Sequence, residues 1–110
     1  MKNLLPEKIK SILLISEGWL VGRSISNIKA GEPVKDYDIL VCNTERFQSV
    51  VSYLKTLFGN PSINSCGGLK FTSKNIEIDI WCEELNHFLL NANSIEFIYN
   101  IKKNILMQNL

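Results

Sequence analysis

The stretch Gly18-Trp-Leu-Val-Gly-Arg-Ser-Ile-Ser-Asn-Ile-Lys-Ala-Gly-Glu-Pro-Val-Lys-Asp-Tyr-Asp-Ile-Leu-Val41 decides how this chain folds. Its two apolar runs predict two short buried strands. The first run ends on the turn Gly22-Arg23-Ser24, and the second follows directly after Asp36-Tyr37-Asp38. A strand that stops at a glycine, a polar turn and two acids at the start of a new strand together suit a phosphate and its metal ions.

Length and composition predict one domain over residues 1–110, with a core of ordinary hydrophobicity. The chain has 110 residues, of which 45% are hydrophobic, and its net charge is +1 from 12 basic and 11 acidic side chains. This balance excludes a strongly basic field that would hold a long nucleic acid unaided. Three cysteines without a CxxC pair, and the absence of a signal-like or membrane-spanning run, lead us to expect a cytoplasmic protein with reduced thiols and no membrane contact.

Around the opening stretch, apolar spacing predicts alternating helices and strands. The longest predicted helix covers residues 44–58, where apolar side chains form one stripe and Gly59-Asn60-Pro61 ends the helix. Thr44 is its expected N-cap, and Ser24 is the expected N-cap of a short helix over residues 24–30. The other predicted elements are a helix over residues 6–16, strands over 19–21, 37–42, 69–73 and 76–81, and a short helix over 83–91.

The end of the chain allows two interpretations. Residues 95, 97, 99 and 101 are apolar and alternate with other residues, which favours a strand leading through the turn Lys102-Lys103-Asn104 into a second strand. A single helix over residues 95–107 is the competing interpretation. The sequence favours the hairpin only slightly.

Three aspartates carry the chemistry of this sequence. Asp36 and Asp38 project from one face of a strand with their Cα atoms about 6 to 7 Å apart. Carboxylates this close repel each other unless a cation lies between them, and Mg²⁺ prefers oxygen ligands. Asp79 lies in an alternating run, Ile76 to Trp81, on the face opposite the isoleucines. A third carboxylate there would complete a two-metal site for phosphoryl chemistry. An isolated Asp-x-Asp, by contrast, is more often a solvated strand entry.

The combination of motifs resembles the nucleotidyltransferase superfamily typified by DNA polymerase beta. That signature is an apolar residue, Gly-Gly or Gly-Ser, a gap of about a dozen residues, and Asp-x-Asp. Within the superfamily, Leu20-Val21-Gly22 and Gly31 to Ile39 are most similar to the branch of CCA-adding enzymes and bacterial poly(A) polymerases. Gly67 to Phe71, leading to Ile78 to Trp81, looks like the third-acid strand of small relatives. The resemblance covers residues 18–82.

This resemblance implies an α+β domain with the minimal nucleotidyltransferase fold, a small mixed β-sheet with helices packed mainly on one face. It implies that Asp36, Asp38 and Asp79 hold two Mg²⁺ ions and are the catalytic residues. It also implies that the turn Gly22, Arg23 and Ser24 binds the phosphates of an NTP. The sequence departs from the family pattern where Arg23 replaces the second glycine and where Ser26-Asn27 replace an Arg-Asp pair.

Two functions remain open on this basis. The first is a metal-dependent nucleotidyltransferase that moves an NMP from an NTP to an acceptor hydroxyl on a small molecule, a protein or an RNA end. The second is a catalytically silent relative, in which the same fold binds a nucleotide or a protein partner. The size is compatible with a phage or mobile-element origin. A protein partner or a homo-oligomer is compatible with either function, and the acceptor and the base remain unassigned.

Overall fold

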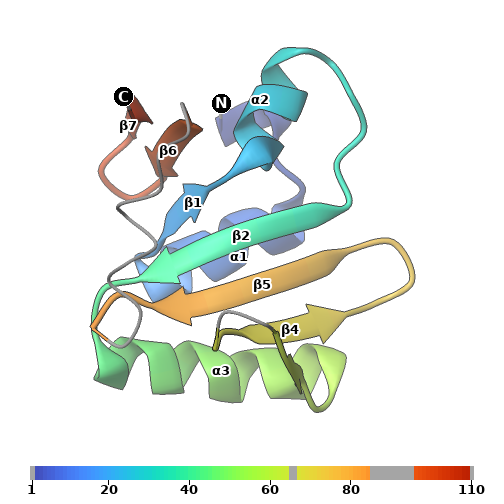
Figure 1. The fold of residues 1–110 in the computed structure, drawn as a ribbon, viewed down its shortest axis with the longest axis vertical. Helices are drawn as coiled ribbons and strands as arrows, with labels where there is room; N and C mark the ends of the chain where they lie inside the picture. The colour runs from blue at the N-terminus through green and yellow to red at the C-terminus, as the bar shows by residue number, and fades with distance from the viewer. Residues whose placement is uncertain (1, 65–66, 85–95, 110) are drawn as a thin grey trace.

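The computed structural model describes residues 2–64, 67–84 and 96–109 and confirms the predicted α+β class. In these residues three α-helices accompany one seven-stranded sheet (Figure 1). A short 3-10 helix, η1, precedes them at Lys2–Leu4. The helices are α1 (Glu7–Ser16), α2 (Arg23–Lys29) and α3 (Thr44–Phe58). The strands are β1 (Trp19–Val21), β2 (Asp36–Val41), β3 (Ser62–Ile63), β4 (Leu69–Thr72), β5 (Glu77–Cys82), β6 (Glu96–Asn100) and β7 (Ile105–Asn109).

The sheet is mixed, with the strand order β3-β4-β5-β2-β1-β6-β7. Only the central pair β2–β5 is parallel among the described strands, and the other neighbours are antiparallel. Parallel strands require a crossover, which here includes α3, whereas β4 and β5 are joined by the predicted turn at Lys74-Asn75. The long central strands therefore start at the same end of the sheet, and their first residues lie side by side.

Side chains alternate between the two faces of the central strands. Tyr37, Ile39 and Val41 of β2 are buried in the core, as are Ile78 and Ile80 of β5. These residues pack with buried residues of α1 and α3, the two helices that Figure 1 shows side by side against the sheet. Because the period of a strand is two, the acidic residues between them project from the opposite face. The core residues from the helices are Ile9, Ile12, Leu13, Val50 and Leu54.

The N-caps of two helices differ from the sequence prediction. Asn43, not Thr44, caps α3, and its Oδ1 accepts a 2.8 Å hydrogen bond from the amide of Arg46. The Thr44 amide and hydroxyl instead donate to the carboxylate of Glu84, at 3.0 and 2.8 Å. The N-cap of α2 is Gly22 in place of Ser24, so this helix begins one residue earlier than expected.

The C-terminal residues confirm the hairpin and exclude the competing helix over the described positions. β6 pairs with β7, and Tyr99 of β6 lies opposite Leu20 of β1 and is buried. Asn104 adopts a left-handed conformation, with φ of 53°, in the turn between the two strands. The helix predicted over residues 83–91 falls almost entirely outside the described residues. None of the described helices has the length and apolar character that a membrane span requires.

Candidate active site

The three predicted aspartates lie on one face of the sheet, at its β2–β5 centre. In the parallel pair, Asp38 is directly opposite Asp79, and Asp36 is opposite Glu77. All four project away from the core, because their neighbours Tyr37, Ile39, Ile78 and Ile80 are buried against the helices. Asp36 is exposed, Asp38 is half-buried and Asp79 is buried, with 7% of its surface exposed. The fold therefore gathers the acids that lie 43 residues apart in the sequence, from position 36 to position 79.

The glycine of the phosphate-like turn lies against one of these acids. Val21, the last residue of β1, is opposite Asp38, which brings Gly22 next to the Asp38 side chain. Gly22 has φ of 81°, and a Cβ placed on it would stand 2.6 Å from Asp38 Oδ2. A side chain here would require Asp38 or the turn to shift, and L-residues rarely adopt this φ. Gly22 thus has two separate structural reasons to be glycine.

A hollow of about 620 Å³ lies between the turn and the start of β2. Gly22, Arg23 and Ser24 form one side of it, and Lys35, Asp36 and Asp38 belong to the other. Arg23 is exposed. Ser24 is only 2% exposed, and its hydroxyl has no hydrogen-bond partner among the described residues. Arg23 and the buried hydroxyl of Ser24 are both potential donors to a ligand oxygen in this hollow.

Glu77 is a fourth carboxylate that sequence reasoning did not assign to the site. The hydrogen bond between Glu77 and Asp36 raises the pKa of Asp36, with burial and the negative charge of Glu77 as further causes. The same hydrogen bond, together with Lys70, lowers the pKa of Glu77. The pair crowds negative charge at the start of β2 and β5, and a bound cation would relieve this repulsion.

Asp79 is held by two residues that sequence reasoning also missed. Lys70 of β4 is opposite Asp79, and its Nζ lies 3.5 Å from Asp79 Oδ2. The amide Nδ2 of Asn64 donates a 3.2 Å hydrogen bond to Asp79 Oδ1. Only Lys70 left a signal in the sequence, because alternation from Leu69 to Thr72 places it on the same face of the hairpin as Asp79. Asn64 lies outside regular structure, so no periodicity could reveal its position.

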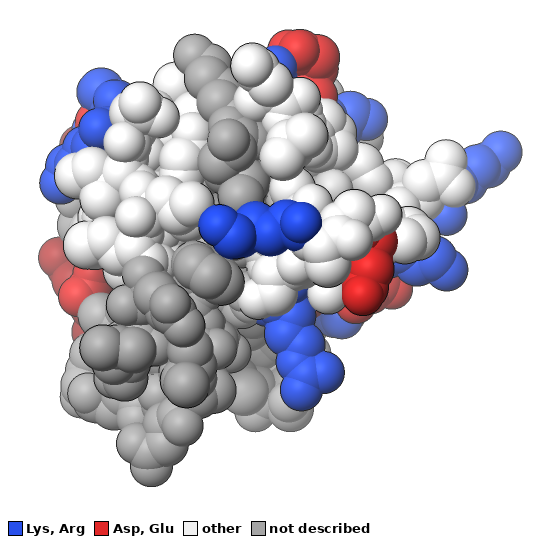
Figure 2. Space-filling model, turned by 90° about the horizontal axis from the view of Figure 1, so that it is seen from above, with Lys and Arg blue, Asp and Glu red and all other residues white. Residues whose placement is uncertain are grey.

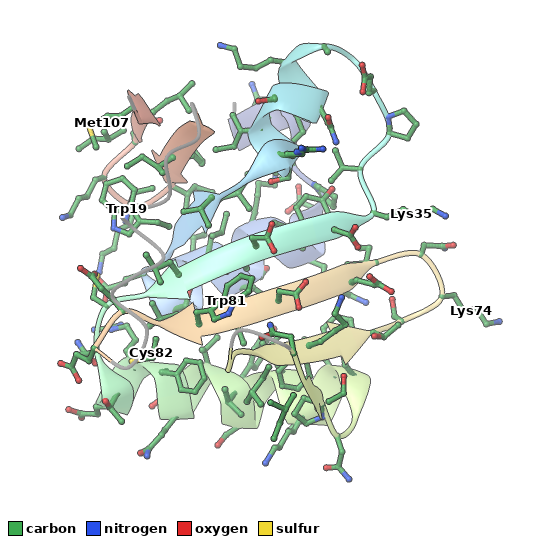
Figure 3. All side chains as sticks on the ribbon, in the orientation of Figure 1. Trp19, Lys35, Lys74, Trp81, Cys82 and Met107 are labelled. Carbon is green, nitrogen blue, oxygen red and sulfur yellow. The ribbon has the colours of Figure 1, made fainter. Side chains whose placement is uncertain are left out.

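A backbone contact holds Asn64 at this point. Its Oδ1 accepts a 2.8 Å hydrogen bond from the amide of Gly68, and its own amide donates to the Gly68 carbonyl at 2.9 Å. Gly68 is in turn packed on Trp81, the β5 residue labelled in Figure 3, since a Cβ on Gly68 would stand 2.4 Å from the indole Nε1. Gly68, just before β4, thus allows a close approach to β5.

The donor set at this face suits a hard cation, but it is not gathered around one point. Carboxylate oxygens are the ligands that Mg²⁺ prefers. Within residues 2–64, 67–84 and 96–109, however, no three His, Cys, Asp or Glu side chains are placed to hold one metal ion together. Asp36 and Asp38 border the hollow, while Asp79 is engaged by Lys70.

Comparison with solved structures shows a nucleotidyltransferase-like fold that resembles part of the CCA-adding enzymes. The similar structures are a CCA-adding enzyme in complex with CTP (TM-score 0.64), one in complex with ATP (0.65) and the Thermotoga maritima CCA-adding enzyme complexed with tRNA (0.64). Each is 17% identical to this chain and covers 99% of it. The chain spans only 30%, 31% and 32% of the CTP, ATP and tRNA complexes' protein chains, respectively. No protein-family model matches this sequence, and no curated protein is significantly similar to it.

Proposed function

We propose that this domain is a metal-dependent nucleotidyltransferase, which moves an NMP from an NTP to an acceptor hydroxyl. The observation that carries the proposal is the juxtaposition of Gly22 with Asp38, and of Asp38 with Asp79, beside a hollow of about 620 Å³. The fold resembles that of CCA-adding enzymes, and two of the similar structures are complexes with CTP and with ATP. This likeness supports an NTP as the ligand.

Asp36 and Asp38 would hold a divalent ion, for which Mg²⁺ is our proposal. When bound, such an ion would neutralise the charge of the phosphates and of the leaving pyrophosphate. Arg23 would donate to phosphate oxygens in a charge-assisted hydrogen bond, and the Ser24 hydroxyl would supply a neutral donor. Gly22 would allow the backbone to approach the phosphates next to Asp38.

The reaction itself would be an in-line displacement at the α-phosphorus. The acceptor oxygen forms a bond to this phosphorus, the bond to the bridging oxygen of pyrophosphate breaks, and the acceptor hydroxyl loses its proton. Asp79, opposite Asp38, is the carboxylate that we propose assists this proton transfer. The acceptor is a hydroxyl on an RNA end, a small molecule or a protein. On the face seen in Figure 2, the described Lys and Arg side chains lie in separate groups.

One observation favours the second function, a catalytically silent relative that binds a nucleotide or a protein partner. Asp79, which the catalytic function needs, is engaged by Lys70 and Asn64. In that case the hollow would still bind a nucleotide, but no pyrophosphate would be released.

The test combines binding with turnover. We would measure NTP binding by calorimetry with and without Mg²⁺, and pyrophosphate release in the presence of RNA ends, hydroxyl-bearing small molecules or the protein alone. The parent protein would be compared with the Asp36→Asn plus Asp38→Asn variant. A matched control, Glu7→Gln plus Glu45→Gln, removes two exposed negative charges from α1 and α3. We expect the parent and the control to bind NTP with Mg²⁺, and the aspartate variant to lose at least about tenfold in affinity.

The outcomes separate the two functions. Magnesium-dependent pyrophosphate release by the parent supports the transferase. Binding without release under every acceptor condition supports the silent relative. Equal NTP binding by the parent and the aspartate variant would show that neither aspartate takes part.

A further inference from the structure

Lys70 contacts two carboxylates of the acidic face, the side of β2 and β5 that carries Asp36, Asp38, Glu77 and Asp79. Its Nζ lies 3.5 Å from Asp79 Oδ2 and 3.5 Å from Glu77 Oε2. Both acids belong to β5 and are separated by one residue, and the β4–β5 register places Lys70 opposite Asp79. The negative charge of Asp79 raises the pKa of Lys70, with Glu77 as a further cause, so the amine stays protonated.

The buried negative charge of Asp79 is in turn stabilised by Lys70. The carboxylate is buried, and a buried charge is costly unless it is paired and hydrogen-bonded. Lys70 supplies the opposite charge on one oxygen, and the Asn64 amide supplies a hydrogen bond to the other. Both oxygens of Asp79 therefore have donors from within the chain. Asp36 and Asp38 border the hollow on the other side of the acidic face, where Asp36 is hydrogen-bonded to Glu77.

From this arrangement we infer that the Lys70 ammonium occupies the place beside Asp79 where a second divalent ion would bind. The domain would therefore bind one divalent ion, on Asp36 and Asp38, and not two. The inference rests on the proposed function, and it assigns Lys70 as a positioning residue. The ammonium would keep Asp79 in place opposite Asp38 and would balance part of the acidic face permanently.

The consequence is electrostatic. A second divalent ion beside Asp79 would approach an ammonium that already lies within 3.5 Å of the carboxylate. At this distance, and with a protein-like effective dielectric, like charges repel strongly enough to weaken binding by about tenfold or more. Removal of the Lys70 charge should therefore open the position for a second ion.

The experiment counts bound ions and does not depend on turnover. We would titrate the protein with Mn²⁺ alone and measure the free ion by electron paramagnetic resonance. The parent should bind one Mn²⁺ ion tightly. The affinity of the Lys70→Met variant for a second Mn²⁺ ion should exceed that of the parent by at least about tenfold. Lys74→Met is the matched control, because Lys74 is exposed at the tip of the turn between β4 and β5 and points away from the sheet (Figure 3). It should bind one ion, as the parent does.

A second variant covers the case in which Lys70→Met does not fold. Asp79→Asn keeps the shape of the side chain, and circular dichroism would establish its folding. If Lys70, and no ion, accompanies Asp79, the Mn²⁺ affinity of Asp79→Asn stays within about threefold of the parent value. A loss of more than about tenfold would show that Asp79 is a metal ligand and would overturn the inference.

The remaining outcomes distinguish the inference from the proposed function. Two ions of similar affinity in the parent, or one ion in a folded Lys70→Met variant, would overturn the role of Lys70 and leave the transferase standing. No ion in the parent or in any folded variant would overturn both.

Discussion

The Cα of Gly22 faces the carboxylate of Asp38 at a distance that leaves no room for a methyl group. A Cβ at this position would stand 2.6 Å from Oδ2, and the residue has φ of 81°. The contact arises because β1 ends at Val21, which pairs with Asp38 across the antiparallel β1–β2 ladder. The turn that we propose binds phosphate is thereby fixed relative to the aspartate that we propose binds metal.

Substitution of Gly22 should therefore damage both stability and the site. In Gly22→Ala the new methyl displaces Asp38 or bends the turn, and the backbone conformation is strained. We expect a loss of about 1–3 kcal/mol in the free energy of unfolding, measured by urea denaturation. We also expect Mg²⁺-dependent NTP binding, measured by calorimetry, to fall at least about tenfold, because a displacement of about 1 Å is costly at such a site.

Gly59 provides the control for backbone strain alone. It has the same φ of 81°, and nothing lies within 4 Å of a Cβ built on it. Gly59→Ala should cost about 1 kcal/mol and leave NTP binding unchanged. Equal effects of the two substitutions on binding would mean that the contact with Asp38 has no part in the site.

Much of this arrangement could be predicted because it follows from short-range pattern. The alternation from Ile76 to Trp81 predicts which side of β5 carries Asp79, and the structure confirms that the isoleucines face the core. The resemblance to nucleotidyltransferases implies that the turn at Gly22 and the strand carrying Asp36 and Asp38 belong to one site, and the β1–β2 pairing brings Gly22 next to Asp38. The first feature follows from strand period, and the second from a family pattern that spans the interval of 14 residues from Gly22 to Asp36.

The rest depends on contacts between distant segments, for which the sequence has no periodic signal. Alternation along β4 indicates the face of Lys70 but not its ion pair with Asp79, and Asn64 lies in a segment without regular structure, so neither partner of Asp79 could be singled out. The prediction of Thr44 as the N-cap, where the structure has Asn43, failed for a similar reason. Both residue types are good caps, and Glu84, 40 residues further along, decides between them by accepting from Thr44.

Substitutions at Asn43 and Thr44 test which of the two residues is the N-cap of α3. Asn43→Ala removes the acceptor for the Arg46 amide and should cost about 1 kcal/mol of unfolding free energy, measured by urea denaturation. Thr44→Val removes a hydroxyl whose bond to Glu84 is exposed, and it should cost less than about 0.5 kcal/mol. A larger effect at Thr44 than at Asn43 would contradict the cap assignment.

The core between α3 and the sheet should respond to truncation. Leu54 is fully buried and belongs to the cluster that includes Ile39 and Ile80. Leu54→Ala should cost about 2–5 kcal/mol, from lost transfer free energy and from the cavity left behind. Ile63→Ala is the control, because Ile63 is 78% exposed, and its effect should stay within about 0.5 kcal/mol. Thermal unfolding followed by circular dichroism would measure both, and similar melting temperatures would contradict the position of Leu54 in the core.

Glu17 links three elements through its charge, and its titration should be visible in the stability of the fold. The residue follows α1 in a left-handed conformation, with φ of 51°, and it forms ion pairs with Arg46 of α3 and with Lys102 of the β6–β7 turn. The hydrogen bond from Lys102, and then the charges of Arg46 and Lys102, lower the pKa of Glu17 below the ordinary value of 4.5. A carboxylate with a lowered pKa in the folded state stabilises the fold above its unfolded pKa, and this contribution disappears as the pH falls through the folded value.

Glu17→Gln should therefore be less stable than the parent at neutral pH, and the difference should shrink as the pH is lowered from about 5 to about 3. The conservative change keeps the length and the hydrogen-bonding capacity of the side chain, so the pH-dependent part reports the charge. The measurement is the urea midpoint at a series of pH values, with Glu32→Gln, an exposed residue in the turn before β2, as the control. A stability difference between the parent and Glu17→Gln that is the same at about pH 3 as at neutral pH would show that the ion pairs with Arg46 and Lys102 do not contribute to the fold.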